Sequence, residues 1–367
     1  MPVRSKTSSR STSVSRAARP ARVKPAKSAA ARSASAPVSP SPAVHFTNVD
    51  KLFFPGDGFT KGDVIRYYLD VAPVLLPHFR DRPVTLIRFP DGVTGEKFYE
   101  KNAPRFTPAW VKTAPVPRSE GGIINYILIN DARTLAWCAN LAALELHPFL
   151  HTARAPDRPT HLVFDLDPGE GADLLACIEV AFLLRARLAR LDLELFPKVS
   201  GSKGLQLYVP LHTRLTYDDT KPFAKAVAEL LQSERPDLIV SDMSKALRKN
   251  KVLIDWSQND DKKTTAGVYS LRAKHDTPFI SLPVTWAELR RAAQKSDVAP
   301  LFFSPAAALR RIAKHGDLFA PVLTLQQKLP RDFLAAAHAS ASSGGRAPAP
   351  RPACSSTSRS TPSAARN

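Results

Sequence analysis

Two aspartates, Asp165 and Asp167, close an otherwise apolar segment that begins at His161 and ends before Pro168. The pattern predicts a β-strand, in which residues two apart share one face with Cα atoms roughly 6.5–7 Å apart. Neighbouring carboxylates repel each other and are costly to desolvate, so something positive must compensate them. Hard oxygen ligands of this kind suit Mg²⁺ or Mn²⁺. Solvation, or pairing with Lys or Arg, is the alternative interpretation of this short pattern.

A second feature is the turn Ser200-Gly201-Ser202-Lys203-Gly204 between two predicted strands. Backbone N–H groups and hydroxyls in such a turn can surround a phosphate, and Lys203 adds positive charge. The spacing is not that of a Walker A loop. An ordinary hairpin turn would use the same residues for their conformational freedom.

A basic stretch, residues 244–251, precedes the short apolar strand predicted over residues 252–255. That strand again ends in an acid, so Asp255 could supply a third carboxylate. Arg248 could reach a triphosphate with its planar fork, and Arg272 lies on a further predicted strand. The alternative is a solvated basic face and an isolated ion pair.

These features together suit metal-assisted chemistry on a nucleoside triphosphate. Carboxylates can hold two metal ions about 3.5–4 Å apart, which activate an attacking hydroxyl and neutralise the leaving pyrophosphate. Lysine and arginine can stabilise the charge that spreads over the phosphoryl oxygens.

The elements that must position these residues form an irregular mixture of helices and strands. Thr60 and Asp63 predict a helix start of the capping-box type, and Pro73 and Pro77 are expected to bend or end that helix. Further helices are expected over residues 131–144, 172–191 and 221–231, and strands over 84–89, 123–129, 161–167, 195–199, 205–210, 252–255 and 267–271. The absence of regular alternation predicts an α+β core with an antiparallel or mixed sheet.

The net charge of +19 lies mostly at the two ends of the chain. Residues 1–43 and 338–367 contain thirteen of the 52 Lys and Arg, no Asp or Glu and few large apolar side chains. We predict disordered basic tails around a domain over residues 44–337. Detached basic arms favour a polyanionic partner such as nucleic acid, with a solubilising role as the alternative. The N-terminal composition also matches an organelle transit peptide.

Other classes of protein are less compatible with the sequence. No apolar stretch is long enough to cross a membrane, and no secretory signal is present. The three cysteines are spaced neither as a disulfide framework nor as a zinc site. We therefore expect a protein of a reducing, cytosol-like compartment.

Several segments in this order resemble the polymerase domain of bacterial ligase D, in the archaeo-eukaryotic primase superfamily, over residues 44–320. The segments are His161–Gly169, Ser200–Gln206, Ile254–Asn259 and Tyr269–Ala273, with Leu52–Pro55, Gly95–Asn102 and Leu144–Pro148 upstream. The resemblance implies a primase-like α+β fold with mixed or antiparallel sheets around a metal-binding cleft. No ligase or phosphoesterase module is seen, which suggests a stand-alone polymerase-type protein.

The resemblance also implies roles for individual residues. Asp165, Asp167 and Asp255 match the catalytic metal-binding carboxylates. The nucleotide site is matched by Ser200, Lys203, Gln206, Arg248, Arg272, His147, Phe98 and Tyr99, with the last two stacking on bases. Lys51 and Lys61 match a pocket for the 5′-phosphate of the downstream strand, where the start of a helix would help Lys61 to hold an anion.

Two positions depart from the family pattern. Gln206 stands where the pattern has histidine, and Asn102 stands where histidine is common. A glutamine amide can donate to a phosphate but stays neutral, and losing one charge-assisted hydrogen bond weakens binding by about 1.5–3 kcal/mol. We therefore expect reduced nucleotide use with intact metal binding.

The resulting hypothesis is a DNA-directed nucleotidyltransferase of non-homologous end joining, which the resemblance implies to be a cytoplasmic, nucleoid-associated protein of a bacterium. It would use Mn²⁺ or Mg²⁺ and add nucleotides from NTPs or dNTPs to a 3′-OH at breaks or gaps that carry a 5′-phosphate. A Ku homologue and a separate DNA ligase are possible partners in that pathway. The alternative is a catalytically weakened or inactive polymerase fold that binds DNA ends.

Overall fold

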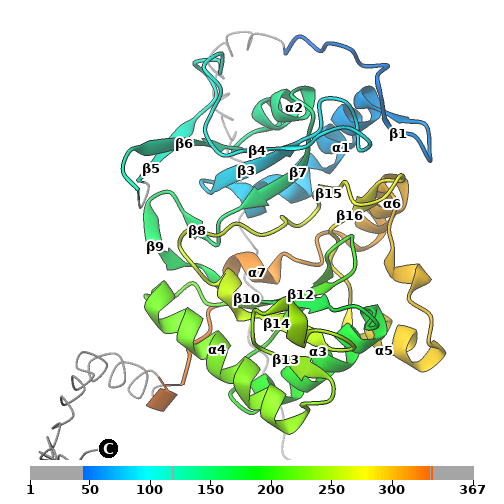
Figure 1. The fold of residues 1–367 in the computed structure, drawn as a ribbon. Coiled ribbons are helices and arrows are strands. Elements are labelled where there is room, and N and C mark those ends of the chain that lie inside the picture. The colour runs from blue at the N-terminus through cyan, green and yellow to red at the C-terminus, as the bar shows by residue number, and fades with distance from the viewer. Residues whose placement is uncertain (1–43, 118–119, 331, 334–367) are drawn as a thin grey trace, which may run out of the picture. The chain divides into compact units, whose positions relative to one another are not determined.

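The computed structural model describes residues 44–117, 120–330 and 332–333, and Figure 1 shows their arrangement. The predicted basic tails, residues 1–43 and 338–367, lie outside these described residues, as does the end of the predicted domain beyond residue 333. In the described part of the chain, no helix is long and apolar enough to span a bilayer.

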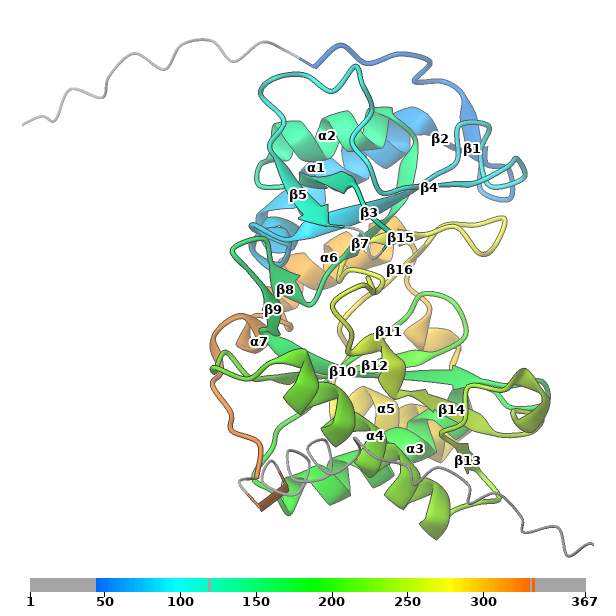
Figure 2. The ribbon, with the colours of Figure 1, turned by 60° about the vertical axis from the view of Figure 1, so that its left-hand side comes forward.

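The N-terminal half forms an antiparallel sheet in which β3 pairs with β4 and β6 along one edge and with β7 along the other. The strands are β3 (Pro83–Arg88), β4 (Phe98–Glu100), β5 (Thr113–Pro117), β6 (Ile123–Leu128) and β7 (Ala143–Pro148). The helices α1 (Lys61–Phe79) and α2 (Ala132–Asn140) pack together over this sheet (Figures 1 and 2). A short hairpin, β1 (Leu52–Phe54) and β2 (Phe59–Thr60), precedes α1.

The second sheet carries the predicted catalytic strands in the order β11-β12-β10-β14-β13. Its strands are β10 (His161–Pro168), β11 (Phe196–Val199), β12 (Leu205–Pro210), β13 (Ile239–Val240) and β14 (Val252–Asp255). Only β13 and β14 run parallel among these pairs, so the prediction of a mixed, largely antiparallel α+β architecture is confirmed. The helices α3 (Leu174–Ala189) and α4 (Tyr217–Glu234) cover one face of the sheet, and α5 (Trp286–Lys295) packs on α3 (Figure 2).

The remaining elements are short. They are the hairpins β8 (His151–Thr152) with β9 (Ala155–Pro159) and β15 (Leu271–Arg272) with β16 (Phe279–Ile280), the helices α6 (Pro305–His315) and α7 (Pro321–Thr324), and 3₁₀ turns at Lys245–Leu247, Trp256–Gln258 and Ala299–Leu301.

The expected capping box at the start of α1 is present. The Thr60 hydroxyl accepts from the Asp63 N–H, and the Asp63 carboxylate accepts from the Thr60 N–H. The helix does not end at Pro73 but continues to Phe79, two residues beyond Pro77. Its buried face packs into the core, and that burial outweighs the backbone hydrogen bonds that proline cannot make.

Two other sequence-based boundaries were wrong. The helix expected over residues 131–144 ends at Asn140, because Ala142 takes a left-handed conformation (φ 62°) and the chain turns directly into β7. The strand expected over residues 267–271 is reduced to β15, since Tyr269 has φ 65° and cannot continue an extended chain. In both cases a short apolar run is compatible with more than one local structure, and only packing against the rest of the chain decides between them.

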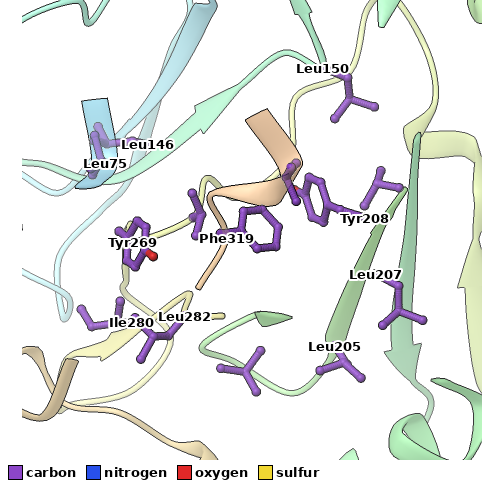
Figure 3. Packing of buried hydrophobic residues seen from close by; sticks show 14 of the residues in the cluster. Leu75, Leu146, Leu150, Leu205, Leu207, Tyr208, Tyr269, Ile280, Leu282 and Phe319 are labelled. Carbon is purple, nitrogen blue, oxygen red and sulfur yellow. The ribbon is translucent and has the colours of Figure 1, made fainter. Parts of the chain in front are cut away.

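One hydrophobic core joins the two sheets. Figure 3 shows Tyr269 and Phe319 between Leu75 and Leu146 on the side of the first sheet and Tyr208 on the second. The rings of Tyr208 and Phe319 meet edge to face, with centroids 5.1 Å apart. The core therefore connects β12, the neighbour of β10, to the first sheet.

The buried side chain of Asn259 completes the hydrogen bonding of β10 next to the carboxylates. Its Oδ1 accepts from the Val163 N–H (2.9 Å), and its Nδ2 donates to the Val163 carbonyl (2.8 Å). It thus replaces a neighbouring strand beyond the end of the β14 pairing.

We predict that Asn259→Ala lowers the free energy of unfolding by about 2–4 kcal/mol, because two buried backbone groups lose their partners. Urea titration measures the change, with the exposed Asn102→Ala as the control, for which we expect less than about 1 kcal/mol. Equal losses in the two variants would contradict the strand-completing role of Asn259.

Candidate active site

The pairing of β10 with β14 brings the three predicted catalytic aspartates together. Asp165 lies directly opposite Asp255, and Asp167 is opposite Leu253, two pairs further along. Residues directly opposite in an antiparallel pair share a face, as do residues two apart on one strand. All three carboxylates therefore belong to the same face of the second sheet, on the side away from the core residues Leu162 and Leu166.

The electrostatics of these groups reflect that crowding. Burial raises the pKa of Asp165 to about 7, repulsion from Asp167 and Asp255 adds to the effect, and a hydrogen bond from Gln206 and the charge of Lys198 oppose it. Burial and the charge of Asp255 also raise the pKa of Asp167, against the nearby guanidinium groups of Arg248 and Arg272. The site therefore favours added positive charge.

The donor set fits a hard divalent cation in type, since it offers carboxylate oxygens from one face of a sheet. Within the described part of the chain, however, no three acidic, histidine or cysteine side chains converge as a ready cation cage. The Asp255 carboxylate instead accepts from the Ser257 N–H (3.0 Å) and the Gln258 amide (2.9 Å). Holding a metal between the three acids requires Asp255 to exchange these local bonds for the ion.

A cleft of about 620 Å³ lies over this face. This volume falls in the range of small-ligand sites. Most of the predicted site residues line it: Tyr99, His147, Asp165, Asp167, Ser200, Lys203, Gln206, Arg248 and Arg272. Gln258, Thr264, Thr265 and Lys274 line it as well.

The Ser200–Gly204 turn forms one wall of the cleft. The Ser200 hydroxyl accepts from the N–H groups of Ser202 (3.2 Å) and Gly204 (3.1 Å), so it closes the turn. A Cβ on Gly204 would lie 2.2 Å from the Leu166 carbonyl oxygen, and glycine is therefore required where the turn crosses β10. Lys203 is exposed at the tip and lines the cleft.

The basic segment before β14 is fixed to the end of the catalytic strand. The Gly169 N–H donates to the Lys251 carbonyl (2.9 Å), and a Cβ on Gly169 would lie 1.8 Å from the Arg248 carbonyl oxygen. Glycine after the Asp167-Pro168 pair thus lets the two segments touch. The contact brings Arg248 to the edge of the cleft, where its Nη2 donates to the Met243 carbonyl (2.6 Å).

Glu145, a buried residue of β7, connects two of the predicted nucleotide-binding residues. Its carboxylate lies 3.2 Å from Arg272 Nε and 2.9 Å from His147 Nε2, and it accepts from the Ala273 N–H. Arg272 in turn donates to the Ser200 carbonyl (2.6 Å). Glu145 therefore links the first sheet to the wall of the cleft formed by the second.

Ionisation in this cluster favours a charged Glu145 and a neutral His147. Burial alone would raise the pKa of Glu145, but the hydrogen bond from His147 and the charge of Arg272 outweigh it and hold the pKa at about 2. Burial lowers the pKa of His147 and outweighs the opposite effect of Glu145. A neutral ring that donates through Nε2 leaves Nδ1 as an acceptor.

Gln206 and Lys198 lie in the same cross-strand row as the catalytic acids. Lys198 pairs with Gln206, Gln206 with Asp165, and Asp165 with Asp255. Lys198 is fully buried and donates to Gln206 Oε1 (2.5 Å) and to the Ser281 hydroxyl (2.6 Å). Burial lowers the pKa of Lys198 to about 7.

The remaining predicted residues lie apart from the acids. Phe98 is half exposed and faces a separate hollow that it shares with Tyr99, which also borders the cleft. Lys51 pairs with Asp91 (2.6 Å), and the Lys61 ammonium donates to the Thr47 carbonyl (2.6 Å). Burial lowers the pKa of Lys61, and the nearby charge of Lys51 adds to this effect, so the two cations are close to one another.

Glu145 and Lys198 were missed by the sequence analysis. Each is a charged residue inside a short apolar strand, as the segments Ala143–Pro148 and Phe196–Val199 show. A charge in such a segment must have buried partners, and that signal could have found both residues.

Comparison with known proteins identifies the family. Residues 60–319 match the family model described as LigD, primase-polymerase domain, so the chain belongs to that family and the resemblance seen in the sequence is confirmed. A solved structure described as the polymerase domain from Mycobacterium tuberculosis Ligase D in complex with DNA is similar in fold. Its TM-score is 0.70 at 41% sequence identity, and the match covers 76% of this chain and 98% of that one.

Curated relatives agree. The multifunctional non-homologous end joining protein LigD of Mycolicibacterium smegmatis is 41% identical over 281 residues, which cover 76% of this chain and 36% of that protein. The bifunctional non-homologous end joining protein LigD of Bacillus subtilis is 33% identical over 283 residues, 77% of this chain and 44% of that protein. The chain thus spans less than half the length of these relatives.

We predict that Glu145→Gln lowers the free energy of unfolding at neutral pH and that this loss becomes smaller in acid. The folded-state pKa near 2 is below the ordinary value of 4.5, so ionised Glu145 stabilises the fold above about pH 4.5, and this contribution is lost as pH falls towards 2. Urea titration should therefore show a deficit of roughly 3 kcal/mol at pH 7 that shrinks below pH 4.5.

The exposed Glu229→Gln is the matched control and should show little deficit at any pH. A Glu145→Gln deficit that stays constant between pH 7 and the acid range would contradict the assignment of an ionised, paired carboxylate.

Proposed function

We propose that this protein is a metal-dependent nucleotidyltransferase that extends a 3′-OH at DNA breaks or gaps. The observation that carries the proposal is the cleft in which Asp165 and Asp167, with Asp255 paired beside them, face Lys203, Arg248 and Arg272. Membership of the LigD primase-polymerase family supports the same reaction class. Because the chain spans less than half the length of the LigD relatives, its role in non-homologous end joining is also part of the proposal.

The three aspartates would hold Mn²⁺ or Mg²⁺, because their oxygen donors and mutual repulsion suit a hard cation. Such ions, when bound, lower the pKa of an attacking hydroxyl and neutralise a departing pyrophosphate. The chain's own contribution is to keep Asp165 and Asp255 opposite each other on β10 and β14, which fixes where both charges gather.

The cationic side chains of the cleft would bind the triphosphate of an NTP or dNTP. Arg248 and Lys203 border the carboxylates from two different segments, so they can contact phosphoryl oxygens from two directions. Arg272 is held by Glu145 and Ser200 and presents an already oriented guanidinium. Tyr99, at the rim, would stack on a base.

The DNA would be held outside the cleft. Lys51 and Lys61 are the proposed 5′-phosphate ligands, and Lys61 stands at the first position of α1, where the helix N-terminus attracts anions. A phosphate would have to replace Asp91 at Lys51 and Thr47 at Lys61. A Ku homologue and a separate ligase remain the proposed partners.

We predict that Asp165→Ala and Asp167→Ala each reduce extension of a labelled, gapped DNA in the presence of Mn²⁺ and NTPs by about a thousandfold or more. The exposed Asp218→Ala, on α4, is the matched control and should retain activity. Wild-type inactivity combined with DNA binding that depends on a 5′-phosphate would instead support the end-binding alternative.

We also predict that Lys51→Ala and Lys61→Ala remove the preference for a 5′-phosphate. Each loses a charge-assisted contact, so affinity for phosphorylated gapped DNA should fall by about tenfold, with little change for the unphosphorylated DNA. Fluorescence anisotropy on the two DNAs measures this, with Lys314→Ala as a surface control. An unchanged ratio between the two affinities would place the 5′-phosphate elsewhere.

A further inference from the structure

The buried Lys198 is a charge that the proposed mechanism does not yet use. It has no carboxylate within ion-pair distance among the residues that the structure describes. An ammonium group buried in this way costs stability unless it is compensated, and an apolar residue of the same size would be cheaper. A role outside packing would account for this cost.

Hydrogen-bond polarity connects Lys198 to the catalytic acid. Lys198 Nζ donates to Gln206, so the amide faces it with Oε1, at 2.5 Å. The amide nitrogen then faces the other way, where it donates to the Thr265 hydroxyl (2.9 Å) and hydrogen-bonds the Asp165 carboxylate. Lys198 thus sets the orientation of the amide, whose donor side lies towards Thr265 and towards Asp165, the cross-strand partner of Gln206.

This arrangement turns the donor side of Gln206 towards Thr265 and Asp165. The side chain is only 3% exposed, although it borders the cleft. The charge of Lys198 reaches Asp165 through one intervening amide, so no lysine nitrogen occupies a carboxylate oxygen that a metal ion would need.

We infer that Lys198 and Gln206 are positioning residues that orient the Asp165 carboxylate for metal binding, and that position 206 requires one acceptor towards Lys198 and one donor towards Asp165. This inference rests on the proposed function. A neutral histidine also offers one acceptor nitrogen and one donor nitrogen, so it meets the same requirement. Glutamine at position 206 therefore preserves the reaction, in place of the weakened nucleotide use expected from the sequence.

Mn²⁺ binding to the full chain tests this positioning role. Electron paramagnetic resonance of the free ion measures it, without DNA or nucleotide. Groups that orient metal ligands typically change metal affinity by about 10–100-fold, so Gln206→Leu and Lys198→Met should bind Mn²⁺ at least about tenfold more weakly. Gln206→His should stay within about threefold of the wild type.

Gln327→Leu is the matched control, because Gln327 is also a buried glutamine but bonds to Glu194 and Pro210, which do not border the cleft. It should lower the melting temperature without changing Mn²⁺ affinity. Circular dichroism checks that each variant folds, and Gln206→Leu decides the test if Lys198→Met does not fold.

Steady-state extension gives a second readout. A positioning role predicts that Gln206→Leu lowers kcat with little change in the KM for NTP, whereas a phosphate contact would raise KM. Mn²⁺ affinity in Gln206→Leu equal to that of the wild type, or in Gln206→His as weak as in Gln206→Leu, would overturn the inference.

The Mn²⁺ series is independent of extension, so the two proposals can fail separately. If Mn²⁺ affinity follows the expected order across the wild type and the variants but the wild type does not extend DNA, the enzyme proposal is rejected and the positioning role is supported. A wild type that extends DNA while Gln206→Leu binds Mn²⁺ normally does the reverse. A wild type that does not bind Mn²⁺ overturns both.

Discussion

The antiparallel pairing of β10 with β14 concentrates negative charge at one point of the second sheet, since it sets Asp165 against Asp255 beside Asp167. Like charges at this spacing destabilise a fold unless positive charge is supplied. Much of the surrounding structure supplies it: Lys203 on the Ser200–Gly204 turn, Arg248 beside Gly169, and Lys198 behind Gln206. The cations in and behind the cleft wall offset this repulsion.

A second constraint is that the cations come from different parts of the chain and must be held in register. Glu145 does this from the first sheet, because its buried carboxylate touches both His147 and Arg272. The shared core around Tyr269 and Phe319 keeps the two sheets from shifting against each other (Figure 3). Electrostatic and hydrophobic contacts therefore both hold the walls of the cleft in place.

Gln206, a departure from the family pattern, can be interpreted in two ways. Considered as a phosphate ligand, glutamine is a poorer residue than histidine because it carries no charge. In the folded protein its amide lies between Lys198 and its cross-strand partner Asp165, and under our inference the property that matters is acceptance on one side and donation on the other. Which property matters depends on neighbours that are distant in sequence.

Local sequence patterns were enough to predict the family, the α+β class, the capping box of α1 and the strands that carry Asp167 and Asp255. These features depend on periodicity and on motifs that lie within a few residues. It could not place the end of α2, the short β15 or the partners of Lys198 and Glu145. Those depend on which segments pack together. A short apolar run is compatible with helix or strand, and the partners of a buried charge come from segments distant in sequence. The union of Asp255 with Asp165, ninety residues apart in the chain, was decided only when β14 paired with β10.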